Sequence, residues 1–200
     1  MEQVKDELLE FWFGDDPDDA SVAAAKAELW WGHKPETDEL LRERFGTAAS
    51  AASVGILDHW AGSPRGRLAL ILLLDQIPRV VNRGSPEAFA MDVDARKVAS
   101  QGIESGADRL LRPIERVFFY LPFEHSEEIE DQERSVELFR ELVNEVPAEH
   151  RETFASFLDY AVRHREVIAR FGRFPHRNIV LGRESTPEEK AFLEQPGSSF

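Results

Sequence analysis

Three short polar segments carry most of the side chains that could do chemistry, and each contains a proline. They cover residues 75–84, 120–128 and 170–183. Together they supply carboxylates, histidines and arginines, whereas the segments between them have the spacing of ordinary amphipathic helices. Planar arginine forks bind phosphates and carboxylates, and a histidine beside a carboxylate can take up or release a proton. These residue types predict a site for a small anion with acid or base groups beside it.

The first segment begins with Asp75 and Gln76, directly after the most apolar run of the chain, residues 68–74. We therefore expect both side chains at the edge of the core, where an ionised carboxylate must find a partner. In one interpretation, Asp75 pairs with an arginine and ties helices together. In the other, Arg79, Asn82 and Arg83 offer a forked set of donors to an anion. Under the second interpretation, Asp75, Gln76, Arg79 and Arg83 are ligand-binding residues.

The second segment places Glu124 and His125 just before Ser126, which has the residue type of a helix N-cap. Burial and a neighbouring charge can bring the pKa of either group toward neutrality, so Glu124 and His125 are candidate catalytic residues. A buried structural histidine is the alternative. His125 could also bind a metal together with Glu128 and Asp131, but their spacing matches no known metal motif, and we expect no metal.

The third segment crowds like charges on a short connector. Gly172 is expected to end a helix, and Pro175 to stiffen the turn that follows. Positive side chains this close repel one another unless acidic groups or an anion neutralise them. The neutralising partner is either the acidic stretch 124–152 or a bound phosphate or carboxylate. The candidate ligand-binding residues are Arg173, Arg177, Asn178 and Arg183, and His176 joins His125 as a candidate acid or base.

Three functions are compatible with these residues. The first is binding of a small anionic ligand in a pocket where the three segments meet. The second is a hydrolase or transferase that uses His125 or His176 as acid or base at a phosphate or carboxylate ester. The third is an interaction scaffold, in which a concave helical surface binds a peptide and the polar segments lock helices together. No nucleophile, metal or cofactor motif selects among them, so we expect no cofactor and leave enzymatic activity open.

The composition limits the class of partner. The chain has 38 acidic against 24 basic residues and a net charge of −14. This balance repels phosphate backbones and anionic lipid, so neither nucleic acid nor a membrane surface is expected as a partner. Residues 163–183 are the exception, with six arginines against one glutamate. The oligomeric state is not readable from the sequence.

The length of 200 residues predicts one domain spanning residues 1–200. The chain has no cysteine, which removes disulfides and thiol nucleophiles and suits a reducing compartment. The first residues lack the basic and apolar regions of a signal peptide. The longest apolar run has seven residues, residues 68–74, against about 20 for a membrane span. We therefore expect a cytoplasmic protein.

The elements that position the polar segments are predicted to be helices throughout. Apolar residues recur with the 3.6-residue period almost everywhere, and no segment shows the alternation of a strand. We expect an all-α fold of about nine helices in a compact antiparallel array. His164 falls on the apolar face of its helix, where a core histidine is expected. The expected helices are residues 4–13, 23–31, 38–55, 64–77, 86–102, 113–120, 126–146, 148–171 and 187–193.

Capping residues and prolines set the expected helix boundaries. Thr37 is predicted to cap the third helix, and Ser126 to begin the long helix that follows the second polar segment. Thr186 and Glu189 are predicted to form a capping box at the start of the last helix. Ser85, followed by a proline, is predicted to start a helix that continues to about residue 102. Pro78 is expected to end or kink the helix before it, and Pro122 to close the helix that begins near residue 113.

Four motifs resemble those of the bacterial family named domain of unknown function 924. They are FWFG at residues 11–14, LLLDQIPR at 72–79 with RG at 83–84, LPFEHSE at 121–127, and RFGRFPHRN at 170–178 with LGR at 181–183. The resemblance extends from about residue 8 to about residue 193, although Val80 stands where the family usually has asparagine. It implies an all-helical fold of the tetratricopeptide-like class and brings no settled activity, cofactor or catalytic residue.

Overall fold

The computed structural model describes residues 2–198, and all regular secondary structure in them is helical. The expected all-α class is therefore confirmed. α4 and α5 are joined without a break by a π-helical turn, Leu72–Gln76, so the ten α-helices of this part of the chain form nine rods. The helices are α1 (Glu2–Phe13), α2 (Asp19–Trp31), α3 (Pro35–Ser53), α4 (Pro64–Ile71), α5 (Ile77–Val81), α6 (Asp92–Glu104), α7 (Pro113–Glu124), α8 (Ile129–Glu145), α9 (Arg151–Phe171) and α10 (Pro187–Leu193).

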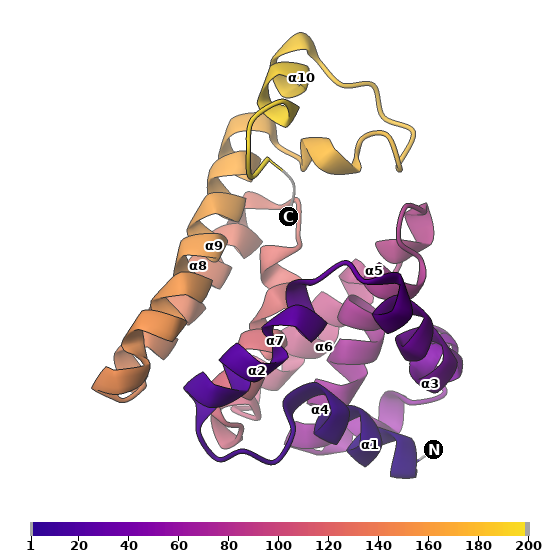
Figure 1. The fold of residues 1–200 in the computed structure, drawn as a ribbon, viewed down its shortest axis with the longest axis vertical. Helices are drawn as coiled ribbons and strands as arrows, with labels where there is room; N and C mark the ends of the chain where they lie inside the picture. The colour runs from indigo at the N-terminus through magenta and orange to yellow at the C-terminus, as the bar shows by residue number, and fades with distance from the viewer. Residues whose placement is uncertain (1, 199–200) are drawn as a thin grey trace.

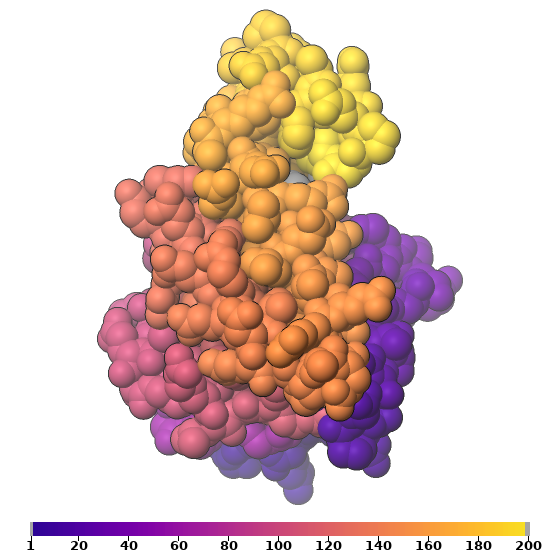
Figure 2. All heavy atoms as spheres, turned by 90° about the vertical axis from the view of Figure 1, so that its left-hand side faces the viewer, coloured from indigo at the N-terminus to yellow at the C-terminus, as the bar shows by residue number. Residues whose placement is uncertain are grey.

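The helices form a body and a projecting pair. In Figure 1, α1 to α7 gather in the lower part of the molecule, and α8 and α9 lie side by side and lean away from it. Figure 2 shows this pair covering one face. The connection between them, residues 146–150, is short enough to make the pair antiparallel. The C-terminal arm, residues 172–198, carries α10 near the end of α9 (Figure 1).

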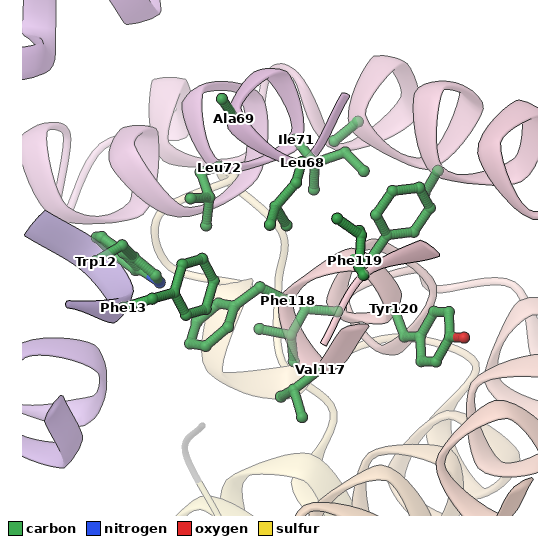
Figure 3. Close-up of a cluster of buried hydrophobic side chains, with 14 of the residues drawn as sticks. Trp12, Phe13, Leu68, Ala69, Ile71, Leu72, Val117, Phe118, Phe119 and Tyr120 are labelled. Atoms are coloured by element: carbon green, nitrogen blue, oxygen red, sulfur yellow. The ribbon is translucent and has the colours of Figure 1, made fainter. Parts of the chain in front are cut away.

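The main core lies between α1, α4 and α7 (Figure 3). Trp12 and Phe13 of α1 meet Phe118 of α7 edge-on, with ring-centroid distances of 5.6 and 5.5 Å. Every residue of α7 from 114 to 124 is buried, including the charged residues Glu115, Arg116 and Glu124. Full burial of each aromatic ring contributes about 2–3 kcal/mol. The core therefore holds α7 firmly, and with it His125, which follows the last turn.

Two helices begin earlier than predicted. α2 begins at Asp19 rather than near residue 23, because Asp18 caps it by accepting the backbone N–H of Ser21 at 2.7 Å. α3 begins at Pro35, since proline fits the first turn of a helix. The expected N-cap Thr37 is therefore wrong and lies inside α3.

Two other helices begin later than predicted. Ser85 caps only a short 3-10 turn, Pro86–Ala88, and α6 starts at Asp92. Ser126 accepts the backbone N–H of the residue two positions later, and α8 starts at Ile129. The predicted starts at residues 86 and 126 are therefore wrong. In both places the serine hydroxyl stabilises a local turn, and such a turn forms without a helix behind it.

The two internal prolines do not end their helices. Pro122 lies inside α7, which continues to Glu124, so the predicted end at residue 120 is wrong. A proline in a helix interior costs about 3 kcal/mol, and the burial of α7 offsets this cost. Before Pro78, the N–H of Ile77 bonds to the C=O of Leu72, five residues back, and the helix resumes as α5. The expected break at Pro78 is thus replaced by a π-helical widening.

α1 begins at Glu2 rather than residue 4, and α9 at Arg151 rather than residue 148, whereas the predicted end of α9 agrees with the structure. Gly172 adopts the left-handed conformation, with φ of 67°, and ends α9. Thr186 and Glu189 form the predicted capping box of α10. None of the helices within residues 2–198 has the length and apolar character to cross a membrane. The tetratricopeptide-like arrangement and the single domain stay predictions.

Candidate functional site

Asp75 is at the centre of a buried set of polar side chains. It lies in the π-helical turn and has no exposed surface. Its Oδ1 accepts a hydrogen bond from Nδ1 of His125 at 2.8 Å, and its Oδ2 accepts one from Nε2 of Gln76 at 2.6 Å. Arg79 lies 3.2 Å from Oδ1 and donates to the backbone C=O of Asp75 at 2.7 Å. Although burial opposes ionisation, the charge of Arg79 and the hydrogen bonds from His125 and Gln76 hold the pKa of Asp75 well below its usual range.

His125 follows the last turn of α7, and 14% of its side chain is exposed. Burial, reinforced by the positive charge of Arg79, lowers the pKa of His125, so the ring is neutral at pH 7. Because Asp75 is ionised and accepts a hydrogen bond from Nδ1, the proton of the neutral ring lies on Nδ1. Nε2 therefore carries the lone pair. This arrangement, a histidine oriented by a buried carboxylate, is typical of a general base.

Glu124 forms a second acid–histidine pair beside the first. Its Oε1 lies 3.2 Å from Nδ1 of His164, which also donates to the C=O of Tyr160 at 2.8 Å. Burial, followed by the negative charge of Asp75, raises the pKa of Glu124 to about 8. Burial lowers the pKa of His164 to about 3. At pH 7 the contact therefore joins a protonated carboxyl group to a neutral imidazole rather than two ions.

Asp92, the first residue of α6, connects two arginines. Its carboxylate oxygens lie 2.9 Å from Nη1 and 2.9 Å from Nη2 of Arg79. The second oxygen also lies 3.4 Å from Nη1 of Arg177. The two arginines therefore share one carboxylate, and the link to Arg177 is the longer of the two. We call the assembled set the buried polar cluster; it consists of Asp75, Gln76, Arg79, Asp92, Glu124, His125, His164 and Arg177.

Arg177 enters the buried polar cluster from the C-terminal arm and is 6% exposed. Its guanidinium carbon lies 4.6 Å from the ring centroid of Phe89 and 4.4 Å from that of Phe174. Its buried Nε has no hydrogen-bond partner among the described residues. Burial, followed by the charge of Arg79, lowers the pKa of Arg177 to about 10. This arginine is thus held by two aromatic faces and by only one long hydrogen bond.

His176 neighbours Arg177 in the short turn Pro175–Arg177. Its ring centroid lies 5.6 Å from that of Phe174. Burial and the adjacent charge of Arg177 lower its pKa to about 4, so His176 is neutral at pH 7. Of the two candidate acid–base histidines, His125 is therefore the one that a buried carboxylate orients.

Arg83 is not brought into the buried polar cluster. Its Nε and Nη2 donate to the two carboxylate oxygens of Asp38 at 2.9 and 3.1 Å, and its Nη1 lies 2.6 Å from Nδ1 of His33. These contacts join the end of α5 to α3 and to the residues after α2. Arg83 therefore stabilises the packing of these segments.

The other predicted arginines of the third segment hold the C-terminal arm. Arg173 donates to both oxygens of Glu189 at 2.6 and 2.8 Å. Arg183 donates to both oxygens of Glu127 at 2.6 and 2.9 Å. Asn178 has no exposed surface and bonds within the arm. The structure places these three outside the buried polar cluster.

Sequence reasoning did not single out Asp92 or Phe89, and it assigned His164 to the core. Asp92 looks like an ordinary acidic residue in the first turn of a helix. Its spatial role depends on an arginine 85 residues away. His164 is buried as predicted, but it contacts the polar side chains of Glu124 and His125 as well as Phe174.

The residues of the alternative metal site in the second segment, His125, Glu128 and Asp131, do not form a metal site in the structure. Asp131 accepts hydrogen bonds from Ser126 and Arg96, which hold the loop before α8. Within residues 2–198, no three histidine, aspartate or glutamate side chains are grouped so as to hold a metal ion. Two shallow surface depressions, one beside Phe11 and one between α8 and α9, contain no residue of the buried polar cluster.

Comparison with known proteins identifies relatives without an assigned activity. A family model described as bacterial protein of unknown function (DUF924) matches residues 8–197. The chain is 38% identical to a solved protein of unknown function, ATU0120 from Agrobacterium tumefaciens. The two structures superpose with a TM-score of 0.75 over 88% of this chain and 99% of that chain. Comparison with curated proteins gave no match.

Proposed function

The chain belongs to the DUF924 family of bacterial proteins of unknown function, and from its buried polar cluster we propose that it binds a small phosphate or carboxylate anion through Arg177. The proposal rests on one side of the Arg177 guanidinium, where a buried N–H donor has no acceptor among residues 2–198. Nη1 of Arg177 bonds to Asp92 at 3.4 Å, whereas its buried Nε has no partner among residues 2–198. Nε and Nη2 form a planar two-donor fork that matches an oxyanion.

The same edge binds carboxylates elsewhere in this protein. In four other arginines, Nε and Nη2 both donate to one carboxylate. These pairs are Arg44 with Glu7, Arg83 with Asp38, Arg170 with Glu188, and Arg173 with Glu189. Arg67 and Arg183 also leave a buried Nε unbonded, but each makes two or more hydrogen bonds through its Nη atoms. Arg177 differs from all of these because it combines deep burial with a single long bond.

The energetics favour an anionic occupant. A buried donor without a partner costs about 1–3 kcal/mol, and more when it is charged. The pKa of Arg177, lowered to about 10, reflects the same strain, because burial and the charge of Arg79 both disfavour the cation. The charges of Asp92, Glu127 and Asp75 favour the cation, but they do not offset burial and the charge of Arg79. A bound oxyanion supplies both the hydrogen bonds and the charge.

The C-terminal arm controls access to Arg177. Since Arg177 is 6% exposed, a ligand reaches it when the arm moves. The arm adds Phe174 to a small hydrophobic cluster that is separate from the main core. It is also held by Glu127, which binds Arg183 and the backbone N–H of Phe174. Partly exposed ion pairs contribute little, so displacing the arm costs less than opening the core.

Thermal melts with defined anions test the proposal. We expect inorganic phosphate or succinate to raise Tm above the value in chloride at equal ionic strength. At 100 times Kd, a ligand adds about 2.7 kcal/mol of stability. For a chain of this length, that corresponds to a rise of roughly 5–10 °C. Comparing phosphate with succinate separates the two ligand chemistries.

Two arginine variants provide the matched comparison. Arg177→Met keeps an adaptable apolar side chain between Phe89 and Phe174, and Asp92 keeps its hydrogen bond and its ion pair with Arg79. We expect its Tm without ligand to stay within about 2 °C of wild type, because an unsatisfied charge is removed. The gain from anions should disappear. Arg183→Met should lower Tm but keep that gain. An anion gain that survives in Arg177→Met, or none in wild type, would overturn the proposal.

A further inference from the structure

The orientation of His125 leaves one ring nitrogen for chemistry. Its Nδ1–H is bound to Asp75 at 2.8 Å, and Asp75 is fixed in turn by Gln76 and Arg79. Nε2 therefore keeps its lone pair, and 14% of the side chain remains exposed. A neutral imidazole held in this way can accept a proton from a bound molecule.

One chain of polar contacts joins this base to the anion fork. Oδ1 of Asp75 lies 2.8 Å from His125 and 3.2 Å from Nη1 of Arg79. Arg79 reaches Asp92 at 2.9 Å, and Asp92 reaches Arg177 at 3.4 Å. The base and the fork are therefore bound to one continuous network of charged groups.

A second chain, made of ring contacts, joins the same two ends. The ring centroids of His125 and His164 lie 6.4 Å apart, and those of His164 and Phe174 lie 5.5 Å apart. The guanidinium carbon of Arg177 lies 4.4 Å from the Phe174 ring. The contacts thus close a loop that contains both His125 and Arg177.

The side chains of the cluster favour proton transfer over covalent catalysis. None of its eight residues has a hydroxyl or a thiol, and the chain has no cysteine. Asp75 and Asp92 are occupied by arginines and are poor nucleophiles. Removal of a proton from carbon needs only a base, an anchor for the substrate and positive charge near the oxygen that becomes negative. The cluster supplies all three.

Resting on the proposed anion site, we infer that the protein catalyses proton transfer at C3 of a bound 2-oxo carboxylate. The substrate carboxylate bonds to the Arg177 fork. Nε2 of His125 takes the C3 proton, the C–H electron pair forms the C2–C3 double bond, and the carbonyl oxygen becomes an enolate. The charges of Arg79 and Arg177 stabilise that oxygen. Return of the proton to C3 restores the carbonyl, so no group leaves and no further reactant is needed.

Exchange of hydrogen for deuterium measures this step directly. Pyruvate and 2-oxobutanoate are incubated with the protein in D₂O, and the loss of the C3 proton signal is followed by NMR. We expect exchange faster than in buffer alone, with a decrease of about 100-fold or more in His125→Gln. His59→Gln, which changes a histidine with 62% side-chain exposure, is the control and should exchange like wild type.

Asp75 acts through His125 and is tested by the position of the ring proton. Long-range ¹H–¹⁵N spectra of the wild type should show His125 protonated at Nδ1, with Nε2 bare. In Asp75→Asn, we expect the other tautomer and a similar loss of exchange, while stabilisation by succinate persists. If Asp75→Asn does not fold, the wild-type spectrum still decides, because a proton on Nε2 at pH 7 overturns the inference.

The outcomes separate this inference from the proposed function. Stabilisation by succinate that depends on Arg177, without exchange that depends on His125, overturns the proton-transfer inference and leaves anion binding intact. Exchange that is equal in wild type and His125→Gln also overturns it. Absence of both stabilisation and exchange overturns both proposals.

Discussion

Replacing Glu124 by glutamine tests the electrostatics of the buried polar cluster. Glu124 and His164 lie in contact, 3.2 Å apart, and both are nearly fully buried. Two descriptions of this contact make opposite predictions. If it is an ion pair, glutamine leaves a buried imidazolium without its partner and destabilises the protein by about 3–5 kcal/mol. If the carboxyl group is protonated, glutamine imitates its shape and neutrality and costs little at acid pH.

The pKa values favour a protonated Glu124 beside a neutral His164. They also determine whether wild-type stability rises or falls with pH. Glu124 has a pKa of about 8 in the folded chain, against 4.5 as the ordinary value. Between these values the folded state binds more protons than the unfolded state, so wild-type stability falls as pH rises. The slope is at most about 1.4 kcal/mol per pH unit, with a ceiling near 5 kcal/mol above pH 8. Because relaxation and water entry reduce such costs, we expect about 2–4 kcal/mol.

Urea unfolding of wild type and Glu124→Gln at pH 5, 6, 7, 8 and 9 measures this difference. We expect similar stabilities at pH 5 and an increasing advantage of Glu124→Gln up to pH 8 to 9. Taking the difference removes the histidine contributions common to both proteins. Glu128→Gln, at an exposed position four residues later, should differ from wild type by a constant amount. Parallel curves for Glu124→Gln, or a less stable variant at pH 8, would refute the neutral description.

Two further substitutions test the packing around α7. Gly102→Ala should destabilise by about 1–2 kcal/mol, because a Cβ there would lie 2.4 Å from Cζ of buried Phe119, whereas Gly46→Ala, with its nearest neighbour at 3.8 Å, should stabilise by about 0.5–1 kcal/mol. Denaturant midpoints measure both, and equal shifts would contradict the packing argument. Tyr120→Phe should cost about 2 kcal/mol, because it removes the 2.7 Å hydrogen bond to buried Asp108. Unchanged stability would show that this bond contributes nothing.

Local signals predicted local features well. Gly172 and the Thr186 capping box depend on residues next to each other in the chain, and both predictions were confirmed. Pro122 was predicted to end a helix by an equally local rule, but the core buries α7 on every side and the helix continues. Ser126 has a capping residue type, yet its hydroxyl stabilises a turn before α8. Burial and tertiary contacts, which the sequence does not display, decided these two cases.

In the candidate site, too, the sequence predicted local features but not tertiary contacts. Asp75 and His125 each stood out by residue type and by proximity to a proline, and the structure joins them at 2.8 Å. Which arginine accompanies them was not predictable, because Arg83 and Arg177 have the same chemistry in the sequence. The choice depends on distant partners: Asp38 lies against Arg83, whereas Arg177 contacts Asp92, which it shares with Arg79. The sequence therefore predicted which segments contribute to the site, whereas tertiary contacts determine which of their side chains lie in the buried polar cluster.

The arginines of residues 163–183 do not form a broad basic surface. The six arginines of residues 163–183 suggested a basic surface that attracts anions. In the structure, Arg170, Arg173 and Arg183 are each bound to a glutamate, so half of these six arginines are neutralised by glutamates within the fold. The acidic partners come from α10 and from the loop before α8. A protein with a net charge of −14 therefore does not attract anions over a broad face. We therefore assign anion binding to the buried fork of Arg177, and this is why Arg177→Met is the decisive variant.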